Sequence, residues 1–145
     1  MGNICRSPLA EGVFLHHCER RSIGHHYEVE SAGIGGWHAG DPADHRSRAV
    51  AMSNGIELVT RSRQVNSSDF VDFDLLIAMD EENVRDLIDL GCPESKIRRL
   101  MEYHPGSEHD HVPDPYYGGD DGFELMYRLV DAAIIRFLDQ HHPDS

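Results

Sequence analysis

The sequence predicts a three-layer α/β fold, in which a mainly parallel central sheet carries helices on both faces. Helix-like and strand-like segments alternate along the chain of 145 residues. The segment 73–79, Phe-Asp-Leu-Leu-Ile-Ala-Met, is a short apolar run of the kind that parallel sheets bury on both faces. The chain has no internal repeat and no linker rich in Pro, Gly and Ser. We therefore expect residues 1–145 to form a single domain.

The first elements are a helix and a strand. Ser7 and Pro8 suit a helix N-cap followed by proline at the first helical position. Apolar residues then recur on one face, which predicts a helix to about Arg21. The segment 27–32 predicts a strand, which Gly33 ends.

A loop and a second helix precede the apolar run. Residues 34–40 contain too many glycines for a regular element, so we expect a loop there. The segment 43–54 has a helical pattern that Gly55 ends. After the strand 73–79, Asp80 is expected to cap the next helix.

The last third of the chain predicts a helix, a strand and a long final helix. The helix that begins after Asp80 is ended by Gly91. Residues 96–103 suggest another strand. The final helix is expected over 122–140 because its apolar residues fall on one side, namely Phe123, Met126, Val130, Ala133, Ile134 and Phe137.

Composition excludes several classes of function. The formal net charge of −13 argues against general nucleic-acid binding, because a protein that follows a phosphate backbone needs a surplus of Lys and Arg. No apolar run approaches the roughly 20 residues of a membrane helix. The first residues also lack the pattern of a secretory signal. We therefore expect a cytoplasmic protein with no membrane partner.

The cysteines and histidines do not form a recognisable metal site. Cys5, Cys18 and Cys92 are an odd number of cysteines at wide spacings, which fits reduced thiols. Several of the eleven histidines are adjacent in sequence, and neighbours on one helix or strand point apart. We expect neither a metal nor a cofactor.

Residues 2–8, Gly-Asn-Ile-Cys-Arg-Ser-Pro, suggest an anion-binding loop. They lead directly into the first helix, so backbone N–H groups and the helix dipole would converge on one small anion. Arg6 can offer a bidentate guanidinium fork to phosphate oxygens. Taken alone, the pattern is equally compatible with an ordinary helix start and a surface arginine.

The chain resembles the low-molecular-weight protein tyrosine phosphatases along nearly its whole length. Residues 1–7 match the family's motif C-x-G-N-x-C-R-S from its second position onward. Residues 31–33 followed by Trp37, the stretch 63–87, and the acid-loop segment 112–119 continue the likeness in register. The resemblance implies a phosphatase I-like fold and hydrolysis of phosphotyrosine proteins or small aryl phosphates. A cysteinyl-phosphate intermediate and inorganic phosphate, as product or inhibitor, are also implied.

The resemblance also implies roles for individual residues. Arg6 would bind phosphate, Ser7 would stabilise the thiolate and the leaving sulfur, and Asp114 would act as general acid and then as base. Asn3 and Ser31 would support the loop by hydrogen bonds. Loop N–H groups and an aromatic rim would bind the substrate, through Gly2, Asn3, Ile4, Cys5, Arg6, Trp37, Tyr116 and Tyr117.

Cys5 is not expected to be the nucleophile. The family's nucleophile lies six positions before the arginine that matches Arg6, and Met1 stands at the variable position that follows it. Cys5 instead resembles the second loop cysteine, which can protect the nucleophile through a disulfide. We therefore expect the interior first strand and the nucleophile to be absent from this chain, which would be inactive as written. A coding sequence that starts further upstream would restore both.

Two other functions remain open at this stage. An arsenate reductase shares the fold and the loop but needs a relay of further cysteines, for which Cys92 could be recruited. A pseudophosphatase would keep Arg6 and bind phosphate without turnover. The aromatic acid loop around Asp114 argues against both alternatives.

Overall fold

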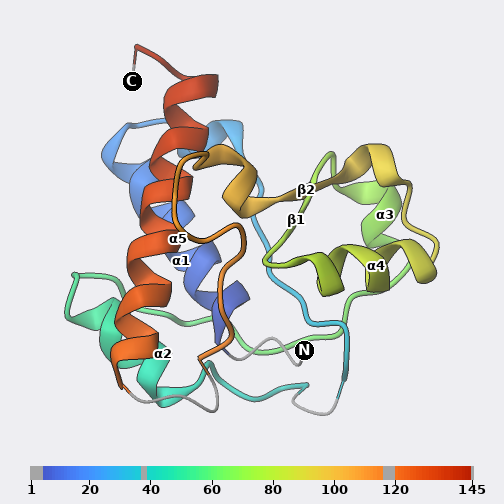
Figure 1. Cartoon of the computed structure of the whole chain (residues 1–145), viewed down its shortest axis with the longest axis horizontal. Helices are drawn as coiled ribbons and strands as arrows, with labels where there is room; N and C mark the ends of the chain where they lie inside the picture. The colour runs from blue at the N-terminus through green and yellow to red at the C-terminus, as the bar shows by residue number, and fades with distance from the viewer. Residues whose placement is uncertain (1–4, 37–38, 116–119, 145) are drawn as a thin grey trace.

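Helices cover both sides of a parallel pair of strands, as predicted (Figure 1). The computed structural model describes residues 5–36, 39–115 and 120–144. One layer contains α1 (Arg6–Arg20), α2 (His45–Met52) and α5 (Asp120–His141), and the layer across the strands contains α3 (Asp69–Asp72) and α4 (Glu81–Asp89). The strands between these layers are β1 (Leu76–Ala78) and β2 (Ile97–Arg99).

The helices begin and end close to the predicted positions. Asp44 accepts a hydrogen bond from the N–H of Arg46 at 2.8 Å, which explains why α2 starts two residues later than predicted. Asp80 caps α4 in the same way, through the N–H of Asn83 at 2.8 Å. Gly91 has a φ of 101° just after α4, a conformation that favours glycine.

The predicted strand over 96–103 is wrong beyond Arg99. β2 pairs with β1 in parallel, with Leu76 opposite Ile97, and the chain then turns into the 3₁₀ helix η3 (Leu100–Tyr103). The carboxylate of Glu102 accepts the N–H of Arg99 at 2.9 Å, which stabilises the start of this turn. Shorter 3₁₀ turns that the sequence did not predict occur at η1 (Gly24–His26) and η2 (Glu94–Lys96).

The predicted strand over 27–32 is extended but is not paired as a strand. Only Gly33 forms a bridge, in parallel with Gln64. Among the described residues, no strand lies between this segment and β1, and a cavity occupies the space. The segment therefore has the conformation of a strand without a partner on that side.

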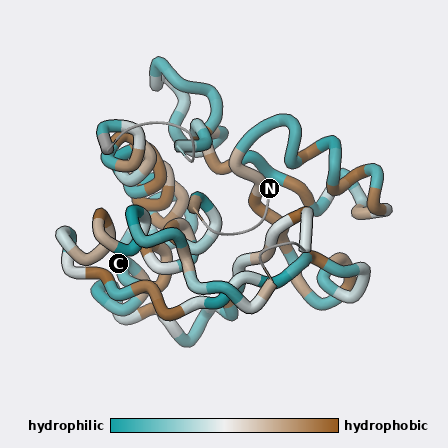
Figure 2. Tube along the Cα trace, turned by 90° about the horizontal axis from the view of Figure 1, so that it is seen from below, coloured by the Kyte–Doolittle hydropathy of each residue, from teal (hydrophilic) through white to brown (hydrophobic). Residues whose placement is uncertain are grey.

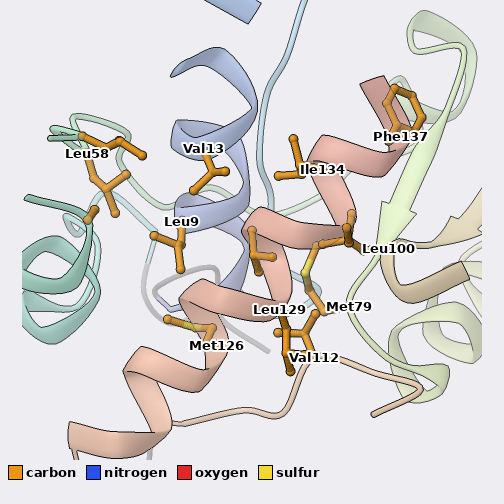
Figure 3. Packing of buried hydrophobic residues seen from close by; sticks show 14 of the residues in the cluster. Leu9, Val13, Leu58, Met79, Leu100, Val112, Met126, Leu129, Ile134 and Phe137 are labelled. Carbon is orange, nitrogen blue, oxygen red and sulfur yellow. The ribbon is translucent and has the colours of Figure 1, made fainter. Parts of the chain in front are cut away.

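Apolar side chains of α1 and α5 pack against each other and form the main core. Leu9 and Val13 of α1 pack in one core with Met126 and Ile134 of α5, and all four are almost fully buried (Figure 3). A smaller cluster beneath α3 and α4 contains Phe70, Leu87, Cys92 and Ile97. Figure 2 shows the hydrophobic positions gathered inside, with hydrophilic loops around them. The amino end of α1 is thereby fixed against the carboxyl end of β1.

Candidate active site

Arg6 is held at the amino end of α1 by two groups from distant parts of the chain. Its Nη1 donates to Oδ2 of Asp80 at 2.6 Å and to the carbonyl oxygen of Val112 at 2.8 Å. The residue is only 7% exposed. Within the described ranges, Nη2 and Nε have no hydrogen-bond partner. One nitrogen therefore fixes the guanidinium group, while its other N–H donors are available to an oxyanion.

Asp80 supplies the negative charge beside Arg6. It lies two residues after the end of β1 and also caps α4. Burial alone would raise the pKa of Asp80, but the hydrogen bonds from Arg6 and from the N–H of Asn83 outweigh burial and lower it. Sequence reasoning predicted the cap and missed the ion pair. The position of Asp80 just after a predicted parallel strand could have indicated its place near the site, because polar residues at such positions often face a ligand.

Cys5 is buried, with 5% of its surface exposed. Burial, together with the carboxylates of Asp44 and Asp114, raises the pKa of its thiol to about 12, against smaller opposing effects of Ser47 and Arg46. A thiol with such a pKa is protonated at pH 7. This environment is the opposite of the electropositive surroundings that activate a cysteine.

Ser47 is a further support that sequence reasoning missed. Its side chain is completely buried on α2, and its Oγ donates to the carbonyl oxygen of Cys5 at 3.2 Å. This bond joins α2 to the residue that precedes α1. No local pattern marks Ser47, because its partner lies 42 positions away in the sequence.

Predicted site residues from three parts of the chain line one cavity of about 630 Å³. Cys5, Arg6 and Ser7 come from the start of α1, Ser31 from the extended segment, and Asp114 from the segment before α5. Asp114 is exposed, whereas Ser31 is buried with no hydrogen-bond partner for its Oγ in the described part of the chain. The remaining predicted residues lie outside the described ranges: Gly2, Asn3, Ile4, Trp37, Tyr116 and Tyr117.

An ion pair holds the wall of this cavity beside Gln64. Arg63 donates from Nη1 and Nη2 to the two carboxylate oxygens of Asp69, at 3.0 and 3.1 Å. Burial raises the pKa of Asp69, but the hydrogen bonds from Arg63 and from the N–H of Asn66 lower it overall. Gly33 bonds to residues 63 and 65 at 2.9 and 2.8 Å, so this pair also fixes the end of the extended segment.

The three cysteines are free and buried, in agreement with the prediction of reduced thiols. In the described ranges, no group of three or more His, Cys, Asp or Glu side chains is arranged to hold a metal ion. None of the helices described is long and apolar enough to cross a membrane.

Comparison with known proteins identifies the family. A family model described as low molecular weight phosphotyrosine protein phosphatase matches residues 1–144. A low molecular weight protein-tyrosine-phosphatase of Streptomyces coelicolor is 46% identical over 143 residues, which cover 94% of this chain and 87% of that protein.

Solved structures agree with this match. The crystal structure of a protein tyrosine phosphatase from Entamoeba histolytica, with Hepes in the active site, is 36% identical, with a TM-score of 0.92 over 100% of this chain and 95% of that one. A Drosophila arginine phosphatase is 30% identical and also has a TM-score of 0.92, over 100% of this chain and 96% of that one. The chain therefore belongs to the low-molecular-weight phosphotyrosine protein phosphatase family, a family of hydrolases.

Proposed function

We propose that this protein hydrolyses phosphotyrosine and small aryl phosphate monoesters through a cysteinyl-phosphate intermediate, using a nucleophilic cysteine from outside these 145 residues. The observation that carries the proposal is the guanidinium group of Arg6. It is anchored on one side by Asp80 and Val112, and it lies at the amino end of a helix in a cavity that Asp114 also lines. That arrangement suits binding of a phosphate dianion.

In the first chemical step, a thiolate attacks phosphorus while the bond from phosphorus to the phenolic oxygen breaks. The free N–H donors of Arg6, with the loop N–H groups at Gly2, Asn3 and Ile4, would stabilise the charge on the three equatorial oxygens. Ser7 would donate to the thiolate. Asp114 would protonate the departing phenolate, so the phenol leaves as a neutral molecule.

In the second step, water replaces the cysteine on phosphorus. Asp114, now a carboxylate, takes a proton from the water as the oxygen attacks. The thiolate leaves, and inorganic phosphate is the product. The aromatic residues Trp37, Tyr116 and Tyr117 would contact the phenyl ring of the substrate before the first step.

None of the three cysteines in the chain has the environment of a nucleophile. Burial raises the pKa of Cys18 and Cys92 as well as that of Cys5. We therefore propose that the 145 residues alone do not catalyse the reaction. The free thiols also support the proposed cytoplasmic location, because disulfides are rare in that compartment.

The other two candidate functions have less support. A redox relay needs cysteines near one another, but Cys92 packs in the small cluster with Phe70 and does not line the cavity that contains Cys5. A protein that only binds phosphate has no use for a carboxylic acid beside the anion, and Asp114 lines the same cavity as Arg6. Hydrolysis uses both Arg6 and Asp114.

The test compares this chain with one extended before Met1 by a short apolar strand that ends in cysteine. We expect the extended protein to hydrolyse phosphotyrosine peptides and nitrophenyl phosphate, and to lose activity when the added cysteine is changed to serine. The 145-residue chain should show no activity that thiol alkylation abolishes. Phosphoarginine serves as the competing substrate, because one similar protein is an arginine phosphatase.

Three results would contradict the proposal. Alkylation-sensitive turnover by the 145-residue chain would return the nucleophile to Cys5. A folded extended protein that binds phosphotyrosine peptide without turnover would be a pseudophosphatase. A clear preference for phosphoarginine would change the substrate class.

A further inference from the structure

The end of α5 contacts the turn after α1 through three histidines and a tyrosine. The hydroxyl oxygen of Tyr27 lies 2.7 Å from Nε2 of His142, although the two residues are 115 positions apart in the sequence. The ring centroids of His26 and His142 are 5.4 Å apart, and those of His25 and His26 are 4.1 Å apart. We call this group, His25, His26, Tyr27 and His142, the histidine clasp. Figure 1 shows the end of α5 beside the blue turn that follows α1 and contains η1.

Tyr27 connects the clasp to the core and sets the direction of its hydrogen bond. Its ring packs edge-on against Phe14 of α1 at 5.0 Å, and Phe14 packs against Phe137 of α5 at 5.6 Å. Burial, with a smaller contribution from Cys18, raises the pKa of Tyr27. The hydroxyl of Tyr27 is therefore protonated at neutral pH and donates to His142, whose Nε2 accepts only when it carries no proton.

Charged and titratable groups from three elements surround His142. Arg21, at the end of α1, donates to Oδ1 of Asp139 in α5 at 2.8 Å. His141 precedes His142 in the chain, and His26 approaches from η1. Partial burial lowers the pKa of His142, and the charges of His26, His141 and Arg21 lower it further. The docked position therefore disfavours a proton on His142.

The dipole of α5 acts in the opposite direction but does not decide the docking. Carbonyl groups at the end of a helix favour a nearby positive charge. They stay beside His142 whether or not the end of α5 is docked. The groups that change are those on other elements, namely His26, Tyr27 and Arg21. The ion pair of Arg21 with Asp139 favours docking, so we expect a local release and not unfolding of the helix.

We propose that the histidine clasp is a pH-sensitive contact, which holds the end of α5 against η1 at neutral pH and releases it when His26 and His142 both carry protons. A protonated His142 no longer accepts the hydrogen of Tyr27, and two imidazolium rings 5.4 Å apart repel each other. The docked state binds fewer protons than the released state, so docking weakens as the pH falls below the ordinary histidine pKa of 6.5. The inference goes beyond the proposed function, since no residue of the proposed reaction takes part.

Hydrogen exchange of the 145-residue protein at pH 5.5 and pH 7.5 tests the release, after each rate is corrected for the intrinsic exchange of that amide. We expect the protection of amides 139–142 to be lower at pH 5.5 by at least about threefold, while amides 126–134 in the middle of α5 keep theirs. The double variant His26→Gln with His142→Gln removes both charges and should keep the protection of 139–142 at pH 5.5. His45→Gln, an exposed position on α2, is the matched control and should behave as the parent does.

A titration of the imidazole resonances by NMR measures the coupling between the two rings. The spectrum of His142→Gln identifies the resonance of His142. Removing one charge at 5.4 Å in water should raise the titration midpoint of His142 by about 0.3–0.5 pH units in His26→Gln. His45→Gln should not change this midpoint.

Three results would overturn the inference. Unchanged or higher protection of amides 139–142 at pH 5.5 would mean that the dipole of α5 outweighs the clasp. An equal loss of protection in the double variant would assign the effect to other groups. A midpoint of His142 that His26→Gln does not move would show that the two rings are not coupled in solution.

Discussion

Replacing Asp80 with Asn should destabilise the protein through Arg6 and leave α4 intact. Asparagine caps a helix about as well as aspartate, so the bond from the N–H of Asn83 is retained. The charge beside the buried guanidinium is lost. Removing one partner of a buried ion pair typically costs about 3–5 kcal/mol. Here Arg6 keeps its hydrogen bond to the carbonyl of Val112, and the Asp80 side chain is 21% exposed. We therefore expect the free energy of unfolding to fall by about 2–3 kcal/mol.

Urea unfolding at pH 7 measures this cost, and two further variants separate its parts. Asp80→Ala loses the cap as well and should cost about 1 kcal/mol more than Asp80→Asn. Asp44→Asn is the matched control: Asp44 caps α2 in the same way, but its partner Arg46 is 29% exposed, so the change should cost under about 1 kcal/mol. If the free energy of unfolding of Asp80→Asn were within about 0.5 kcal/mol of the parent's, the ion pair would not be the interaction that holds Arg6.

Three other predictions concern pH, thiols and the proton donor. The pKa values of Asp69 and Asp80 are lowered in the folded protein, so the unfolded chain binds more protons than the folded protein below about pH 4. The urea concentration at the midpoint of unfolding should therefore fall steadily from pH 5 to pH 2. A midpoint that does not change with pH would contradict this prediction. The three buried cysteines should resist iodoacetamide at pH 8 in the folded protein and react fully in urea, as mass spectrometry would record, and rapid labelling of the native chain would be inconsistent with their burial. In the cysteine-extended protein, Asp114→Asn should slow cysteine phosphorylation by about 10²–10⁴-fold for phenyl phosphate and far less for nitrophenyl phosphate, whose phenolate leaves almost unaided. Equal slowing for both substrates in single-turnover experiments would remove Asp114 from the role of general acid.

Local signals in the sequence were sufficient for α2, α4 and α5, for the end of α1 and for the centre of β1. They did not predict α3, the start of α1 at Arg6, or the limits of β1 at Leu76–Ala78. These signals act over a few residues, so they can be recognised without the rest of the chain. They are helix caps such as Asp80, the apolar run 73–79 and the periodic pattern of α5. β2 was predicted too long because the pattern of 96–103 is compatible with both a strand and a 3₁₀ turn. The contact of Glu102 with the backbone of Arg99 decides between them.

The candidate site was only partly predictable, for a different reason. Arg6, Ser7 and Asp114 were predicted as site residues because motifs near the two ends of the sequence resemble one family. The partners that hold the site, Asp80 and Ser47, are joined to it over separations of 74 and 42 residues. Pairings at such distances leave no periodic or local pattern, so only the fold reveals them.

The segment 27–32 connects the sequence pattern to the chemistry. It has the composition of a strand, yet among the described residues its backbone makes no pairs on the side of the cavity, because a strand is stabilised by its neighbours and not by its own residues. The proposed reaction needs a thiolate in the cavity that Arg6 and Asp114 line. The high pKa of Cys5 argues that this thiolate does not come from the loop's own cysteine.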